Sequence, residues 1–104
     1  MTIEDIALQL TPGIGVKGAA HLIDTFGDAR HLFAASEEEL TARAGLRPDA
    51  ARQIVRRRAF ADAEREMAYC RRHGITPLAA TGEAYPPLLR EIPDRPHVLY
   101  VMGE

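Results

Sequence analysis

The pentapeptide Thr11-Pro12-Gly13-Ile14-Gly15 lies between two stretches with helical periodicity, residues 2–10 and 16–26. The first glycine lets the chain reverse where a Cβ atom would clash, and the isoleucine can insert into a core. The second glycine begins the next helix with bare backbone N–H groups, which can bind an anion. The pentapeptide is therefore typical of a helix–hairpin–helix that contacts a nucleic-acid phosphate without reading bases.

Both flanking stretches have the pattern of amphipathic helices. Thr2 is suited to cap the first of them, with Asp5 as its capping-box partner. Apolar residues recur in both stretches at intervals of three and four, which is the spacing of one helix face. We expect Pro12 to end the first helix and Gly27 to end the second.

The helical pattern continues from residue 28 to residue 74. Asp28 caps a short turn, and Ser36, followed by three glutamates, begins a helix that ends near Gly45. A long helix is then expected from about Asp49 to His73. Its expected apolar face consists of Ala51, Ile54, Val55, Phe60, Ala63, Met67 and Cys70. The pattern predicts one helical domain over residues 1–74.

The connection before that long helix, residues 44–48, resembles the first hairpin. Each connection is followed by small residues and an aliphatic anchor, so a tandem helix–hairpin–helix domain is expected. The second copy is degraded, because Arg47 replaces the second glycine and Pro48 lacks an N–H group. We expect it to serve structure, with Arg47 and Arg52 as possible side-chain contacts to phosphate.

Charge is distributed unevenly along the chain. The net charge is −2, yet residues 47–74 hold eight arginines against four acids. Three of these arginines, residues 56–58, are consecutive and would fan around a continuous helix, so one or two of them could contact phosphate. A long solvated helix would show the same excess of arginine. Three acids near the first hairpin would weaken phosphate binding there, namely Asp5, Asp24 and Asp28.

The composition changes after Gly74. Residues 75–80 and 98–102 are short apolar runs typical of strands, and the second run is expected to be buried. Between them, residues 85–90 are expected to form a turn with one helical turn. Two short strands joined by a proline-rich loop make a poor independent sheet. We therefore expect a second part, residues 75–104, that forms the incomplete opening of an α/β sheet.

Catalysis finds little support in the sequence. The four histidines lack metal-ligand spacing, and the single cysteine, Cys70, falls on an apolar helix face as a packed thiol. The chain has no phosphate-binding nucleotide motif, no signal pattern and no apolar run that approaches the roughly 18 residues of a membrane span. We expect a cytoplasmic protein that is not an enzyme, holds no metal or cofactor and does not bind membranes.

The stretch from Tyr85 to Gly103 reads YPPLLREIPDRPHVLYVMG. It resembles the YPxxLxxIxDxPxxLYxxG stretch of the bacterial DNA-processing protein A family (DprA, also called Smf). In that family a helical domain with a Pro-Gly-Ile-Gly hairpin precedes a Rossmann-like domain, and the order here is the same. The resemblance implies a tandem helix–hairpin–helix (SAM-like) domain, followed by the first strands of a Rossmann-like sheet, with no enzymatic activity.

The resemblance also implies a role in natural transformation (competence) and recombination. Members of the family bind incoming single-stranded DNA, protect it and help to load a RecA-type recombinase. Their main DNA site is a Gly-Ser/Thr-Arg loop of the Rossmann-like domain, which would follow Glu104. We therefore expect this chain to be an N-terminal piece that lacks the main site and has weak, accessory DNA contacts of its own.

Two functions of different kinds are compatible with the sequence. In the first, the helical part is an accessory, sequence-independent contact for single-stranded DNA. In the second, it is a protein-interaction or scaffold module without DNA binding of its own, which the net charge favours. The nucleic-acid-binding residues expected under the first are Gly13, Ile14, Gly15, Lys17, Arg47, Arg52 and Arg56.

Overall fold

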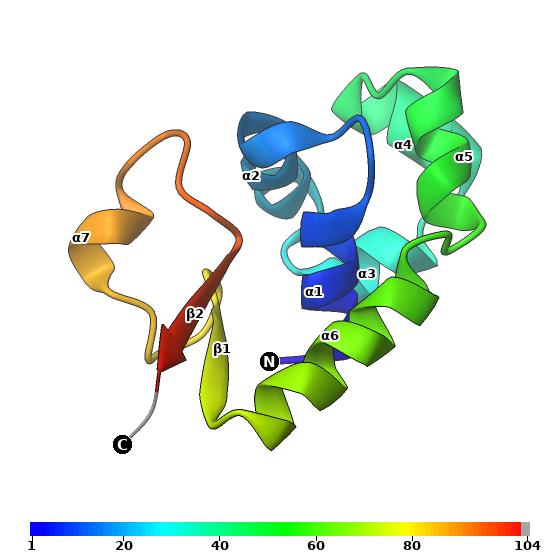
Figure 1. Cartoon of the computed structure of the whole chain (residues 1–104). Helices are drawn as coiled ribbons and strands as arrows, with labels where there is room; N and C mark the ends of the chain where they lie inside the picture. The colour runs from blue at the N-terminus through cyan, green and yellow to red at the C-terminus, as the bar shows by residue number, and fades with distance from the viewer. Residues whose placement is uncertain (103–104) are drawn as a thin grey trace.

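The computed structural model describes residues 1–102, which form a mainly helical fold with one small antiparallel sheet (Figure 1). Gly103 and Glu104, at the end of the expected sheet segment, lie outside the described residues. The elements are α1 (Ile3–Leu10), α2 (Gly15–Phe26), α3 (Ala29–Ala34), α4 (Glu37–Ala44), α5 (Pro48–Val55), α6 (Phe60–Arg72), β1 (Ile75–Ala79), α7 (Pro87–Arg90) and β2 (Val98–Met102). None of the helices within residues 1–102 is long and apolar enough to cross a lipid bilayer.

Polar caps confirm the predicted starts of α1, α3 and α4. The Thr2 N–H donates to Asp5 Oδ2 at 2.9 Å, within a capping box at the start of α1. A second capping box joins Ser36 and Glu39 at the start of α4, and Asp28 caps α3. Each cap satisfies backbone N–H groups that the helix leaves unpaired, so short polar motifs determine where these helices begin.

The core lies around α1, which contacts α2, α3 and α6 (Figure 1). Phe33 and Phe60 meet edge to face beside it, with ring centroids 5.0 Å apart. The largest side chains of the helices that are fully buried are Ile6, Leu8, Leu22, Leu32, Leu40 and Ile54. The inward face of α2 follows the predicted spacing of three and four, whereas α1 is buried on more than one face, because Asp5, Ile6, Ala7 and Leu8 are all buried.

The expectation of one long helix from Asp49 to His73 is wrong, because residues 56–59 separate α5 from α6. α5 ends in a Schellman motif, in which the Arg58 N–H donates to the Gln53 carbonyl at 3.2 Å and the Arg57 N–H donates to the Ile54 carbonyl at 3.0 Å. Arg57 takes the left-handed position of this motif, with a φ of 52°, where glycine is the common residue.

Packing accounts for this break. In a continuous helix, the residue four positions after the buried Ile54 would be Arg58, and its guanidinium would face the apolar core. The break instead brings in Ala59, which is buried, and leaves Arg58 exposed. Val55, predicted to lie on the apolar face, is also exposed, because α5 turns Ala51 and Ile54 inward.

The two predicted strands pair antiparallel, with Ile75 opposite Met102 and Ala79 opposite Val98. The prediction of a buried second strand is only half right. Val98 is buried, but Val101 and Met102 are 40% and 72% exposed. β2 contacts α1 and runs beside β1, between β1 and α7 in the view of Figure 1. Its last two residues are exposed, whereas Tyr100 is partly buried and packs against the core.

Polar side chains of α1 hold the beginning of β2. Gln9 donates from Nε2 to the Val98 carbonyl and accepts the Val98 N–H at Oε1, both at 2.9 Å. Beside this pair, His97 Nε2 lies 2.8 Å from Asp5 Oδ1, and both side chains are buried. The first helix and the last strand are thus joined directly. The division of the chain into two parts after residue 74 stays a prediction.

Candidate nucleic-acid interface

The hairpin between α1 and α2 has the backbone shape that its sequence predicts. Gly13 and Gly15 have φ values of 85° and 72°, which residues with a Cβ atom rarely adopt. Ile14 lies between them and is 9% exposed, within the core. A Cβ atom at Gly18 would lie 3.3 Å from its Cγ2. Ile14 therefore anchors the turn, while both glycines face solvent.

This turn leaves a run of backbone donors free. Within residues 1–102, no hydrogen bond of good geometry is donated by the backbone N–H groups of residues 13–17, although a weaker bond closes the turn at residues 12–14. Ile14 offers no side-chain cap, and the first turn of α2 contains no acidic residue. A helix N-terminus carries partial positive charge, so these N–H groups form a surface that can bind an anion. Lys17 is exposed in the same turn and joins no ion pair within the described residues.

The three acids near this hairpin in the sequence are each engaged elsewhere. Asp5 is buried against His97; burial opposes its ionisation, but hydrogen bonds from His97 and the Thr2 N–H outweigh burial and hold the pKa of Asp5 below its usual range. Asp24 lies 3.6 Å from Arg95, and Asp28 caps α3. Asp24 is nine residues beyond Gly15, or about 13 Å along the helix. Their repulsion of a phosphate at the turn is therefore weaker than the sequence suggests.

The second hairpin, between α4 and α5, offers no comparable run of donors. Gly45 is left-handed, with a φ of 67°, but its N–H and that of Leu46 donate to carbonyls at the end of α4. Pro48 begins α5 without an N–H, and Asp49 adds a carboxylate to the first turn. A ligand at this turn would meet side chains rather than amides.

Contacts between α2 and α4 hold the two hairpins together. His21 Nε2 lies 2.9 Å from the carbonyl oxygen of Ala44, the last residue of α4. Arg43 also donates to the Thr25 carbonyl, at 3.2 Å. Figure 1 shows both turns at the same end of the helical part. No sequence pattern predicts the role of His21, because its partner is a backbone carbonyl distant in the chain.

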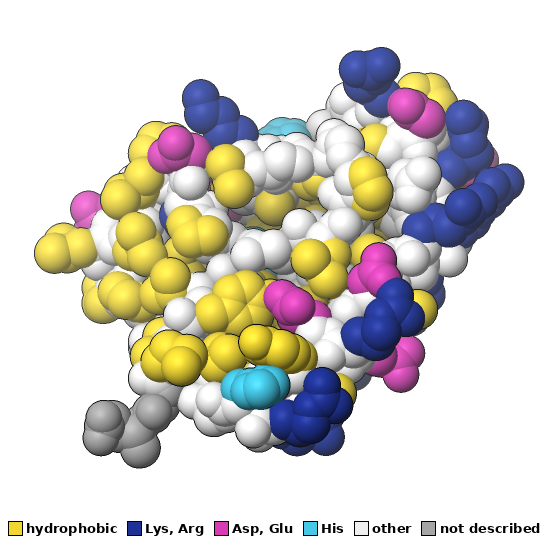
Figure 2. All heavy atoms as spheres, in the orientation of Figure 1, with side chains coloured by type: hydrophobic (Ala, Val, Ile, Leu, Met, Phe, Trp, Pro, Cys, Tyr) yellow, Lys and Arg dark blue, Asp and Glu magenta, His cyan; other side chains and the backbone are white. Residues whose placement is uncertain are grey.

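The predicted arginines lie around the second hairpin. Arg47 lies 3.9 Å from Asp49, and Arg52 lies 3.7 Å from Glu37. Exposed pairs of this kind are weak. Arg52 and Arg56 border a depression of about 180 Å³, whose other lining residues are Asp49, Gln53 and Arg58. Lys17 does not line this depression, so the structure groups Arg52 with Arg56 and not with the first hairpin. Figure 2 shows basic side chains gathered along the edge formed by α5.

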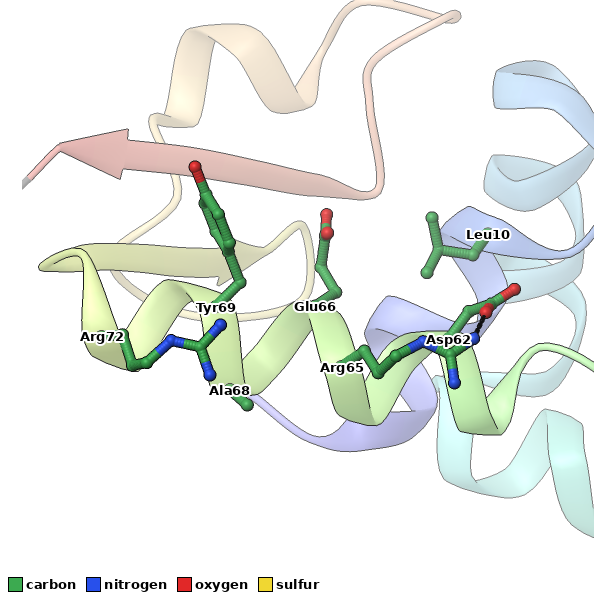
Figure 3. Close-up of a pocket in the computed structure, with 7 residues that line it drawn as sticks. All are labelled: Leu10, Asp62, Arg65, Glu66, Ala68, Tyr69 and Arg72. Atoms are coloured by element: carbon green, nitrogen blue, oxygen red, sulfur yellow. Dashed lines mark hydrogen bonds and ion pairs between the residues drawn. The ribbon is translucent and has the colours of Figure 1, made fainter.

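A larger hollow, of about 670 Å³, runs along α6 (Figure 3). It is lined by Leu10, Asp62, Arg65, Glu66, Ala68, Tyr69 and Arg72. Arg65 pairs with Asp62, whereas Glu66 points toward β2 (Figure 3). Two carboxylates balance the two arginines, so the hollow has no net charge with which to attract a phosphate. It contains none of the predicted nucleic-acid-binding residues.

Cys70 is buried on the inner side of α6, as predicted for a packed thiol. Burial, with a smaller effect of Glu66, raises the pKa of the Cys70 thiol and disfavours the reactive thiolate. Within residues 1–102, no group of three or more His, Cys, Asp or Glu side chains is placed to hold a metal ion.

No protein-family model, curated protein or solved structure matches this chain. The structure itself defines a mainly helical protein with a small antiparallel sheet, in which a glycine-containing turn between α1 and α2 lies beside an exposed lysine.

Proposed function

We propose that residues 1–74 form a tandem helix–hairpin–helix domain that binds the phosphate backbone of single-stranded DNA without regard to sequence. The first hairpin is the main contact, through the amides of residues 13–17 and the side chain of Lys17. Arg47, Arg52 and Arg56 are secondary contacts. Ile14 serves by holding the turn rather than by touching DNA, because its side chain is buried.

The observation that supports this proposal is the run of N–H groups at residues 13–17 that donate no hydrogen bond of good geometry, next to a lysine that joins no ion pair within the described residues. Such donors recognise phosphate oxygens, which are the same at every nucleotide. The small number of cations at the turn predicts weak binding that weakens further as salt rises.

The resemblance of residues 85–103 to the DprA family suggests the setting for this activity. We propose that the protein acts in DNA processing during natural transformation, where it binds incoming single strands and delivers them to a RecA-type recombinase. In this proposal residues 75–104 belong to a Rossmann-like sheet, and the helical domain supplies an accessory DNA contact.

A second candidate function, as a protein-interaction module, is favoured by exposed apolar side chains on α7 and at the end of β2. Leu88 is 80% exposed and Met102 is 72% exposed. Apolar side chains gather on the left of the molecule, over α7 and the sheet (Figure 2). This surface is remote in sequence from the first hairpin, so variants distinguish the two functions.

The test is a fluorescence-anisotropy titration of labelled oligothymidylate at about 50 mM salt, where electrostatic binding is strong. Lys17→Glu reverses one charge at the hairpin and is expected to weaken binding about tenfold or more. Arg30→Glu is the matched control, because Arg30 is also exposed but lies on α3. It is expected to change affinity by less than about twofold. Absence of binding, or an equal effect of both variants, would contradict the proposal.

A further inference from the structure

The junction between α5 and α6 combines a strained backbone with three consecutive arginines. Arg57 is left-handed at a φ of 52° and is the one residue other than glycine with a positive φ in the described chain. Strained conformations of this kind persist where the surrounding structure imposes them, and they concentrate at functional sites. The left-handed turn also changes the directions in which the neighbouring side chains point.

The turn separates the three arginines into two groups. The Arg57 guanidinium lies over the Phe60 ring, 4.9 Å from its centroid. Arg56 and Arg58 both line the depression of about 180 Å³ next to α5. In a continuous helix these two residues would point to nearly opposite sides, about 160° apart. The left-handed residue between them therefore allows two neighbouring arginines to face one site.

The depression has an excess of positive charge. Arg52, Arg56 and Arg58 line it together with the amide side chain of Gln53 and a single carboxylate, that of Asp49. Asp49 lies 3.9 Å from Arg47, and Arg52 lies 3.7 Å from Glu37. With these neighbours included, four guanidinium groups face two carboxylates, which leaves a local charge of +2.

We propose that this depression is a second phosphate-binding site, with Arg52, Arg56 and Arg58 as its charged arms and one phosphodiester of a single-stranded nucleic acid as its ligand. The guanidinium group suits phosphate because its planar fork of N–H donors matches two phosphate oxygens. The small volume suits one tetrahedral group better than an extended acidic peptide. The sequence leaves open which of residues 56–58 would contact phosphate, and the structure adds Arg58 to the predicted Arg52 and Arg56.

The identity of the ligand rests on the proposed function, but the site does not share residues with the first hairpin. Loss of binding through either surface can therefore be recognised separately. The experiment measures affinity for labelled oligothymidylate, as a function of salt, for the unaltered chain and for Arg58→Gln, Arg57→Asn and Lys17→Glu.

Arg58→Gln is expected to weaken binding about threefold or more. It should also lower the slope of log affinity against log salt by about 0.7, because the protein then neutralises one phosphate fewer on the single strand. Arg57→Asn is the matched control. This variant removes the same charge one residue away from Arg58, at a side chain that lies over Phe60 and not in the depression. Asparagine also tolerates the left-handed conformation, so the turn is kept. Its affinity is expected to stay within about twofold of the unaltered chain.

The outcomes separate the two proposals. If Lys17→Glu has no effect while Arg58→Gln weakens binding, the hairpin proposal fails and the arginine site stands. If Arg58→Gln and Arg57→Asn act equally, or neither acts, the arginine site is overturned. In a final experiment, polyglutamate at equal charge concentration competes with the labelled oligothymidylate for the protein. If it displaces the oligonucleotide as well as unlabelled oligothymidylate does, the site recognises acidic chains in general and the assignment to phosphate is wrong.

Discussion

His97 Nε2 lies 2.8 Å from Asp5 Oδ1, and both side chains are almost completely buried. Asp5 also accepts hydrogen bonds from the Thr2 backbone N–H and the Thr2 hydroxyl. One carboxylate thus caps the first helix and attaches the beginning of the last strand to it. A buried carboxylate is stable only when its oxygens are satisfied in this way.

Asp5→Asn is predicted to destabilise the fold at neutral pH by about 1–3 kcal/mol, because buried hydrogen-bond partners lose the carboxylate. Glu4→Gln is the control, because it removes a neighbouring acid that forms no ion pair within residues 1–102. Its free energy of unfolding is expected to change by less than about 0.5 kcal/mol. Urea denaturation measures both.

The same carboxylate predicts how stability depends on pH. The pKa of Asp5 is lower in the folded chain than in the unfolded chain, where it is about 3.9, so the folded state binds fewer protons. Its contribution is therefore complete above this unfolded value and is lost as the pH falls through the lower, folded value. The difference in stability between Asp5→Asn and the unaltered chain should shrink below about pH 4. A difference that stays constant into acid would show that the Asp5 carboxylate does not carry this effect.

The break between α5 and α6 predicts which of two substitutions at Arg57 gives the more stable protein. With Arg57 left-handed, Arg57→Gly is expected to be more stable than Arg57→Ala by about 1 kcal/mol, because alanine incurs the left-handed strain. If residues 49–73 formed one continuous helix, alanine would be the more stable by about 1 kcal/mol. Thermal unfolding of the two variants distinguishes these cases, and neither variant keeps the guanidinium that lies over Phe60.

The shape of the first hairpin is tested by a pair of glycine substitutions. Gly15→Ala forces a Cβ atom onto a φ of 72° and is expected to cost about 1–2 kcal/mol. Gly18→Ala lies in the same helix at an ordinary φ. At this position the higher helix propensity of alanine is offset by the 3.3 Å contact of its Cβ atom with Ile14 Cγ2. The free energy of unfolding is therefore expected to change by less than about 0.5 kcal/mol. Equal effects in urea denaturation would argue against the left-handed turn.

Local motifs explain why most element boundaries could be predicted. The Thr2–Asp5 and Ser36–Glu39 boxes and the glycine at position 45 act within a few residues of themselves, so their effect can be read directly from the sequence. The break at Arg57 could not be recognised in this way, because neither glycine nor proline marks it. The sequence contains one indirect indication of the break: a continuous helix would place the charged Arg58 on the buried face, next to Ile54.

Long-range contacts explain what was missed at the candidate site. The glycines of the first hairpin were predictable because their conformation is a local property. The engagement of Asp5 by His97 was not, because it joins opposite ends of the chain, and it changes the electrostatic setting of the hairpin. The inclusion of Arg58 beside Arg52 and Arg56 depends on the same unpredicted break.

In the proposed function, the backbone amides of the first hairpin contact phosphate. The most direct measurement is a titration of the isotopically labelled chain with oligothymidylate, followed by the backbone amide resonances in ¹H–¹⁵N NMR spectra. If these amides bind phosphate, the resonances of residues 13–17 show the largest shifts, salt reverses these shifts, and Lys17→Glu removes them. Shifts confined to α7 and the end of β2, with residues 13–17 unchanged, would contradict this contact and favour the protein-interaction function.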